Sequence, residues 1–351
     1  MEKGQSMHLG LPLVLLCFTL ADPAPAQWSP RKTGTEARLR GVHAVDEKVV
    51  WASGTKGTFL VTTDSGETWN KGTVPGAEEL DFRDVHAFGS RKATLLASGP
   101  GPLSQLFQTE DSGKTWTRRY TNIYPKGFLD AIAFWDESRG IVLGDPLDGR
   151  FATFLTEDGG KTWHRGPLNG MPAALPDEGA FAASGTCLIV QGKANAWFAT
   201  GGAKVSRVFR TTDGGRRWDV SETPVRAGNP STGIFSIAFR DAKNGIAVGG
   251  DYKVAHAPGP AIARTTDGGL TWKTIAGGPN GYRSAVAAVP GAPTPTWIAS
   301  GPTGSDASID DGETWKPIQG PGFHAVSATG LNAIWAVGDD GKVSWLSGVL
   351  K

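Results

Sequence analysis

The chain has 351 residues and a formal net charge of +1, because 35 Lys and Arg residues nearly balance 34 Asp and Glu residues. This balance gives no electrostatic basis for a nucleic acid or an anionic membrane surface as the main partner. The 49 Gly and 13 Trp residues are typical of many short strands joined by tight turns, and the length suits one large repeat domain.

The first 26 residues have the features of an export signal. Lys3 precedes the apolar run LGLPLVLLCFTL (9–20), and residues 24–26 supply the small side chains of a signal-peptidase site. A membrane anchor is the alternative, but such a short run does not span about 30 Å of hydrocarbon as a helix. We therefore predict a signal peptide at 1–26 with cleavage after Ala26, and an exported protein located in the periplasm or outside the cell.

Removal of this signal leaves Cys187 as the only cysteine, which excludes a disulfide within the mature chain. Cys187 lies in the apolar stretch GTCLIV, so we expect it to be a buried core residue rather than a reactive thiol.

An eight-residue motif of the form [S/T]-x-D-x-G-x-x-W occurs six times, beginning with TTDSGETW at 62–69. The copies recur roughly every 50 residues, and such a period is typical of a propeller or solenoid with one supersecondary unit per repeat. We call them the aspartate boxes (Asp-box repeats). Their aspartates are Asp64, Asp111, Asp158, Asp213, Asp267 and Asp310, and their tryptophans are Trp69, Trp116, Trp163, Trp218, Trp272 and Trp315.

The box has the chemistry of a turn. Its aspartate can accept hydrogen bonds from nearby backbone N–H groups, its glycine permits positive φ, and its tryptophan covers the turn. The pattern does not favour a shared catalytic role, because each carboxylate belongs to a different repeat and the six would lie far apart. Calcium is also disfavoured, because the stretch after Asp158 lacks the acidic residue of an EF-hand loop. We predict structural turns, with no metal, no cofactor and no catalytic residue.

Seven apolar segments predict the innermost strands of seven repeats, at 39–45, 82–88, 128–134, 181–190, 233–239, 282–289 and 323–328. The seventh repeat contains three strands and no box. Because WSP at 28–30 matches the start of a fourth strand in WKP at 315–317, residues 27–33 are expected to complete that repeat. The prediction is a single all-β domain over 27–351, a seven-bladed β-propeller closed by its N-terminal strand.

The run LRGVHAVDEKVVWASGTKGTFLVTTDSGETW (39–69) resembles the opening of the photosystem II stability/assembly factor family and of its exported bacterial relatives. The resemblance covers essentially the whole mature chain. Its specific part is the combination of the boxes with V-W-A-x-G-type strands. It implies a propeller of the sialidase-like superfold and, in phototrophs, a lumenal or periplasmic factor that binds an assembling membrane protein and catalyses no reaction. We expect such a factor to be a monomer with peripheral membrane association.

Propeller connectivity brings the starts of the innermost strands to the same face as the loops between second and third strands, opposite the boxes. A concave mouth with converging charges is the usual setting of a binding site. The alternative is that these side chains pair locally and hold the blades in place. The candidate binding residues are Arg40, Arg83, Asp84, Asp130, Asp145, Asp251, Arg283 and His324.

A sialidase-like glycoside hydrolase acting on a glycan is the alternative function. Such an enzyme needs an arginine cluster, a tyrosine nucleophile, an activating glutamate and an acid. The chain has only 4 Tyr, and no glutamate lies in a predicted innermost strand. The sequence therefore favours a non-enzymatic propeller that binds a protein. His43 and His86 occupy equivalent repeat positions and are expected to pack between blades.

Overall fold

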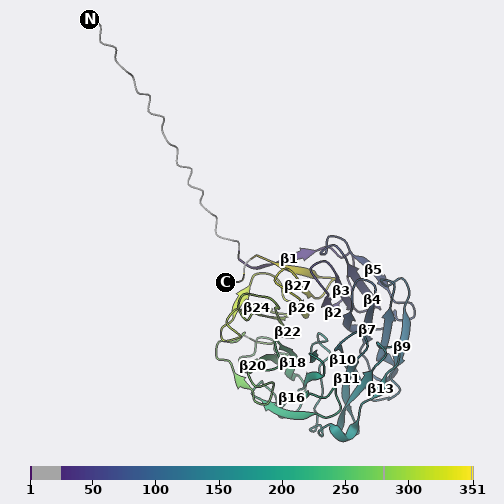
Figure 1. Cartoon of the computed structure of the whole chain (residues 1–351). Coiled ribbons are helices and arrows are strands. Elements are labelled where there is room, and N and C mark those ends of the chain that lie inside the picture. The colour runs from purple at the N-terminus through teal and green to yellow at the C-terminus, as the bar shows by residue number, and fades with distance from the viewer. Residues whose placement is uncertain (2–24, 280, 349, 351) are drawn as a thin grey trace.

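The computed structural model describes residue 1 and residues 25–279, 281–348 and 350. The predicted signal segment lies outside these ranges except for Met1, Pro25 and Ala26. The described chain forms seven antiparallel sheets of four strands, arranged in a ring (Figure 1). The all-β, seven-bladed propeller predicted from the repeats is confirmed.

Each blade runs outward from its innermost strand in chain order. The strands of blade 1 are β2 (Leu39–Ala44), β3 (Val50–Gly54), β4 (Thr58–Thr62) and β5 (Asn70–Thr73). The strands of blade 2 are β6 (Phe82–Ala87), β7 (Ala93–Ala97), β8 (Gln105–Thr109) and β9 (Thr117–Thr121). The strands of blade 3 are β10 (Leu129–Phe134), β11 (Gly140–Leu147), β12 (Arg150–Thr156) and β13 (His164–Arg165).

Blades 4 to 6 follow the same order. Blade 4 contains β14 (Leu188–Gln191), β15 (Asn195–Ala199), β16 (Ser206–Thr211) and β17 (Asp219–Thr223). Blade 5 contains β18 (Thr232–Phe239), β19 (Gly245–Asp251), β20 (Ile262–Thr265) and β21 (Lys273–Thr274). Blade 6 contains β22 (Ala285–Ala288), β23 (Trp297–Gly301), β24 (Gly304–Ser308) and β25 (Lys316–Ile318). Two short 3-10 helices lie in the connections, at Gly101–Leu103 and Leu168–Gly170.

The N-terminal strand closes the ring. Blade 7 contains β26 (Ala325–Ala328), β27 (Ile334–Val337) and β28 (Val343–Ser347), and its outermost strand is β1 (Gln27–Arg31). Strand β1 pairs with β28 along its whole length, and the ring of Trp28 lies 5.0 Å from that of Phe323. The predicted closure is confirmed, with a strand slightly shorter than residues 27–33. Because β1 pairs with β28, the backbone groups at the outer edge of β28 are hydrogen-bonded and that edge is not exposed.

The hydrophobic core lies between neighbouring blades. The second strands of the blades are buried on both faces, and Trp51, Trp297 and Trp335 have no exposed surface. Trp51 of blade 1 lies 6.4 Å, between ring centroids, from the box residue Trp116 of blade 2. A box tryptophan therefore packs against the adjacent blade as well as covering its own turn.

The six box turns share one set of hydrogen bonds. In the first turn, the Thr62 hydroxyl donates to Asp64 at 2.7 Å and accepts the Gly66 N–H at 3.0 Å. The Asp64 carboxylate also accepts the Thr68 N–H at 2.9 Å. Equivalent bonds form around the other five aspartates. Each aspartate is thus occupied in holding its own turn.

Blade 4 differs from the prediction. Residues 181–190 were expected to form its innermost strand, but β14 begins only at Leu188. We call the preceding residues, 181–187, the channel segment. Its Ser184 hydroxyl donates to the Ser284 carbonyl of blade 6 at 2.8 Å, and its Thr186 hydroxyl lies 2.6 Å from the Ser236 hydroxyl of blade 5. These bonds hold the segment against blades 5 and 6, while its last residue, Cys187, still accepts the Ala199 N–H of β15 at 2.9 Å.

A glycine lets the channel segment approach blade 2. Gly185 has φ of +74°, and a Cβ at this position would lie 2.1 Å from Oδ1 of Asp84. Only a glycine meets both conditions. Cys187, at the end of the segment, is fully buried as predicted.

Candidate functional site

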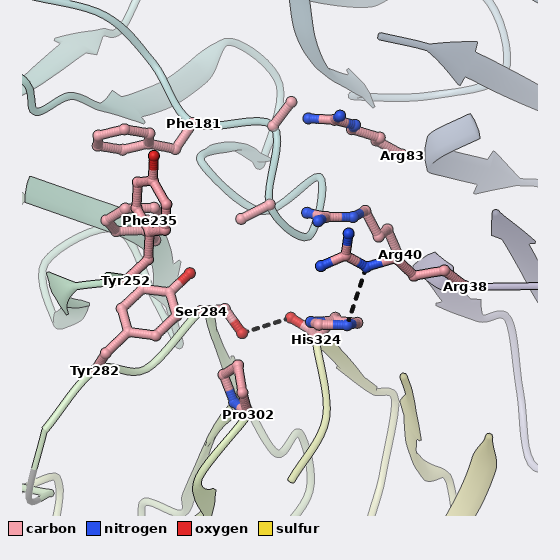
Figure 2. A pocket seen from close by; sticks show the side chains of 12 residues that line it. Arg38, Arg40, Arg83, Phe181, Phe235, Tyr252, Tyr282, Ser284, Pro302 and His324 are labelled. Atoms are coloured by element: carbon pink, nitrogen blue, oxygen red, sulfur yellow. Dashed lines mark hydrogen bonds between the residues drawn. The ribbon is translucent and has the colours of Figure 1, made fainter. Parts of the chain in front are cut away.

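A pocket of about 370 Å³ opens at the mouth of the channel, on the face opposite the boxes. We call it the mouth pocket. Figure 2 shows arginines on one side of it and aromatic rings on the other. Its lining residues are Arg38, Arg40, Arg83, Phe181, Ala182, Ala183, Phe235, Tyr252, Tyr282, Ser284, Pro302 and His324. Three of the predicted binding residues, Arg40, Arg83 and His324, are among them.

Two of the three arginines in this pocket have acidic partners. Nε of Arg38 lies 3.0 Å from Oδ1 of Asp339, and Nε of Arg83 lies 2.8 Å from Oδ2 of Asp81. These guanidinium groups are therefore held by local ion pairs as well as facing the pocket.

Arg40, on β2, is different. Within the described residues it forms no ion pair, and its buried Nε has no hydrogen-bond partner. Burial, reinforced by the nearby charges of Arg83 and Arg38, lowers the pKa of Arg40 to about 10. The group stays protonated near neutral pH, so the pocket wall carries a cation that is not directly paired with any described carboxylate. Such a cation favours an anionic ligand.

His324 lies beside the arginines in the lining of the mouth pocket. Its Nε2 lies 2.9 Å from Oδ1 of Asp339, the same oxygen that pairs with Arg38. Burial lowers the pKa of His324, and the neighbouring arginines act in the same direction. The hydrogen bond with Asp339 acts in the opposite direction, and Asp339 is also the carboxylate that pairs with Arg38.

The opposite wall is aromatic. Phe181 stacks on Phe235 with ring centroids 3.9 Å apart and an interplanar angle of 6°. Tyr282 meets Phe235 edge-on at 4.8 Å, and Tyr252 does so at 6.0 Å. Phe235 and Tyr282 are buried, whereas Tyr252 is 48% exposed at the rim. We call these four residues the aromatic wall.

Sequence reasoning missed most of this wall and also Arg38. The rings come from the channel segment, from β18 and from two loops, and no repeat pattern connects them. One signal for Phe181 was available in the sequence. The run ASGT that follows it consists of small residues that are uncommon in a buried strand, so it indicated that the innermost strand begins later. Arg38 lies one residue before β2, so the alternation Arg38-x-Arg40 was a second available signal.

The predicted acidic residues Asp84, Asp130 and Asp145 do not line the mouth pocket. Asp84 accepts the N–H groups of Val85 and Ile132 at 2.8 Å each, and burial raises its pKa to about 7. Asp145 accepts the Ala180 N–H at 3.0 Å, and burial raises its pKa to about 6. Asp130 is fully buried, and this burial, with Asp145 nearby, raises its pKa well above the usual range.

Asp251 and Arg283 have local structural roles. Asp251 accepts the Ser231 hydroxyl at 2.7 Å and the Lys253 N–H at 3.0 Å, which fixes the loop after β19. Arg283 does not line the pocket, because its NH2 lies 2.6 Å from Oδ2 of Asp306 with both side chains under 10% exposed. The expectation of an open mouth arginine is therefore wrong at Arg283, since its charge is already neutralised inside blade 6.

A second cavity, of about 260 Å³, lies beyond the channel segment. Ser184 lines this cavity, whereas Ala182 and Ala183 line the mouth pocket, so the segment divides the channel. His43 and His86 also line the second cavity, with rings 4.5 Å apart in an edge-on arrangement between blades 1 and 2. This confirms their predicted packing role. Burial lowers the pKa of His43 to about 4.

Two kinds of site are absent from the described residues (1, 25–279, 281–348 and 350). These residues contain no group of three or more His, Cys, Asp or Glu residues placed to hold a metal ion. They also contain no helix whose length and apolar character would let it cross a membrane.

No family model matches the chain. In sequence, it is 35% identical over 68 residues to the photosystem II stability/assembly factor HCF136 of Arabidopsis thaliana. This match covers 18% of the present chain and 16% of the Arabidopsis protein, so it spans only a small part of that relative's length.

The fold comparisons cover much more of the chain. The structure of YCF48 bound to a D1 peptide matches with a TM-score of 0.66 and 16% identity, over 93% of this chain and 96% of that one. YCF48 from Cyanidioschyzon merolae matches with a TM-score of 0.63 and 17% identity, over 91% and 98%. The GH74 enzyme of Niastella koreensis matches with a TM-score of 0.59 and 16% identity, over 89% of this chain and 43% of the enzyme.

These likenesses include a protein bound to a peptide and a GH74 enzyme, so the fold alone does not decide between a binding protein and an enzyme. The resemblance predicted from residues 39–69 is nonetheless confirmed in sequence over a short segment and in fold over most of the chain. This chain is a seven-bladed propeller that resembles the photosystem II stability/assembly factors.

Proposed function

We propose that this chain is an exported, non-enzymatic assembly or stability factor that captures a segment of a protein partner in its mouth pocket. The observation that carries the proposal is the unpaired guanidinium of Arg40, which shares a concave wall with Arg38 and Arg83. Three guanidinium groups with only two acidic partners favour a ligand that brings negative charge.

A polypeptide suits this pocket better than a small anion. A protein of the same fold has been solved bound to a D1 peptide, which supports a peptide segment as the ligand class. Residues 1–26 support export, so the partner is expected in the periplasm or outside the cell. On this proposal the chain acts as a monomer and meets an assembling membrane protein at the membrane surface.

The hydrolase alternative finds less support at this site. Glycoside hydrolysis in most families requires a pair of carboxyl groups flanking the scissile bond. The residues lining the mouth pocket include no Asp or Glu. The arginines here would orient an anion, and the pocket lining offers no carboxyl group as a general acid beside them.

Retention of a partner from the native membrane fraction tests the proposal. We expect immobilised wild-type protein to retain a membrane-protein subunit, and Arg40→Glu to lose most of it, with the greatest effect at low salt. Arg91→Glu is the matched control, because Arg91 is exposed and its carbonyl accepts the Ser112 N–H of the second box turn, on the opposite face.

Melting temperatures of all variants separate lost binding from lost folding, and Arg40→Gln serves as a milder variant. Equal retention by wild type, Arg40→Glu and Arg40→Gln would contradict the proposal. Turnover in a parallel assay with a broad set of glycosides, abolished by the same variants, would support the hydrolase instead.

A further inference from the structure

We infer that the mouth pocket recognises a carboxylate that lies next to an aromatic side chain in the partner polypeptide. The inference rests on the proposed function and specifies the chemistry of the captured segment. It follows from the arginines on one side of the pocket, the aromatic wall on the other, and the two alanines of the channel segment that also line it.

The two walls face each other across the pocket. In Figure 2 the guanidinium groups of Arg40 and Arg83 point toward the space that the aromatic wall borders from the other side. Ala182 and Ala183 of the channel segment also line the pocket and present only methyl groups and backbone to it. The volume of about 370 Å³ is at the small end of ligand sites, so it holds one or two side chains. A carboxylate at Arg40 therefore brings its neighbouring group against the aromatic wall.

The aromatic wall is built before any ligand arrives. Phe235 is buried, is packed by the buried Tyr282 and stacks on Phe181, which is half-buried and lines the pocket. Tyr252 adds an exposed ring at the rim. A ligand that covers the exposed surface of these rings removes apolar area from water, which favours binding. A second ring from the ligand can stack or meet these rings edge-on, and the rigid backing lowers the entropy cost of that contact.

Two sources can supply the carboxylate. It can be the C-terminal carboxylate of a chain that ends in Phe, or the side chain of Glu or Asp beside a Phe within a chain. Both place the same charge next to the same ring. Peptides that offer one source at a time distinguish them.

The test measures the affinity of synthetic nonapeptides for the full chain by titration calorimetry. The first three peptides have amidated C-termini and contain Glu-Phe, Glu-Ala or Gln-Phe at their centre in an otherwise neutral sequence. The fourth contains no acidic side chain and ends in Phe with a free carboxylate. We expect Glu-Phe to bind about five- to tenfold more tightly than Glu-Ala, which corresponds to one aromatic pair. We expect Gln-Phe to bind weakly.

Phe181→Leu assigns this preference to the wall. The variant keeps an apolar side chain, and we expect it to lose the preference, so that it binds Glu-Phe and Glu-Ala with nearly equal affinity. Phe88→Leu is the matched control, because Phe88 is a half-buried ring that packs against His86 and Phe134 and does not line the mouth pocket. It should retain the wild-type preference.

The outcomes separate the inference from the proposed function. Equal affinities of wild type for Glu-Phe and Glu-Ala, both above that for Gln-Phe, would overturn the inference and leave anionic capture intact. Binding of none of the four peptides would overturn the inference, and the membrane-fraction experiment would then decide the proposed function alone. Tight binding of the fourth peptide assigns the carboxylate to a chain terminus, and tight binding of Glu-Phe alone assigns it to a side chain.

Discussion

The hydroxyl of Ser184 donates a 2.8 Å hydrogen bond to the backbone carbonyl of Ser284, which joins blade 4 to blade 6 across the channel. The same hydroxyl lies 2.8 Å from that of Thr186. Ser184 is buried and Thr186 is half-buried. Their hydroxyl groups therefore form with each other and with Ser284 the hydrogen bonds that water would otherwise supply. The channel segment is therefore a fixed floor of the mouth pocket.

Ser184→Ala should loosen this floor. The variant removes the donor and leaves the Ser284 carbonyl with one bond fewer, so we expect a loss of about 1 kcal/mol in the free energy of unfolding. Urea unfolding measures that loss, and hydrogen exchange should become faster in residues 182–187. Ser29→Ala is a control, since its hydroxyl meets that of Ser347 in the outermost strand pair. Unchanged exchange in the channel segment would show that other contacts hold it.

Arg283 should be essential for stability and not directly for binding. Arg283→Ala leaves Asp306 buried without its partner, and we expect a loss of about 3–5 kcal/mol in unfolding free energy. Arg83→Ala breaks the pair with Asp81, whose side chains are 29% and 24% exposed, and should cost about 1 kcal/mol or less. Denaturant unfolding of the two variants gives the comparison. Similar losses in both would contradict the different roles assigned to these arginines.

The box aspartates should contribute stability that acid removes. Hydrogen bonding from Thr162, first through its hydroxyl, holds the pKa of Asp158 at about 2, below its ordinary value of 3.8. A lowered pKa in the folded state means that the contribution is present above about pH 4 and is lost as the pH falls toward 2. We expect Asp158→Asn to melt below wild type at pH 6, with a difference that shrinks by pH 2. A difference independent of pH would exclude this linkage.

Asp145 should show the opposite dependence. Burial raises its pKa from 3.8 to about 6, so its contribution is fully present below pH 4 and is lost as the pH rises through 6. Asp145→Asn keeps an oxygen for the Ala180 N–H and cannot ionise. We expect wild type to lose melting temperature between pH 4 and pH 7 relative to this variant, with little further change at higher pH. Parallel curves for the two proteins would mean that Asp145 is not protonated in the folded state.

The amino-acid sequence determined the architecture because the architecture is repeated locally. Each box brings its own aspartate, hydroxyl and glycine within eight residues, so the turn forms wherever that pattern occurs. Seven innermost segments and six boxes left one blade incomplete, and Trp28 indicated which segment completes it. Connectivity then placed Arg40, Arg83 and His324 at one mouth.

The tertiary structure alone decided the chemistry of that mouth. Whether an arginine at the start of an innermost strand is free or neutralised depends on a carboxylate elsewhere in the blade, and Asp306 neutralises Arg283 whereas no described carboxylate pairs with Arg40. The channel segment leaves blade 4 because its hydroxyls find partners in blades 5 and 6. These contacts join residues 50 to 100 positions apart. A repeat pattern describes only residues that are close in the sequence, so it does not predict such contacts.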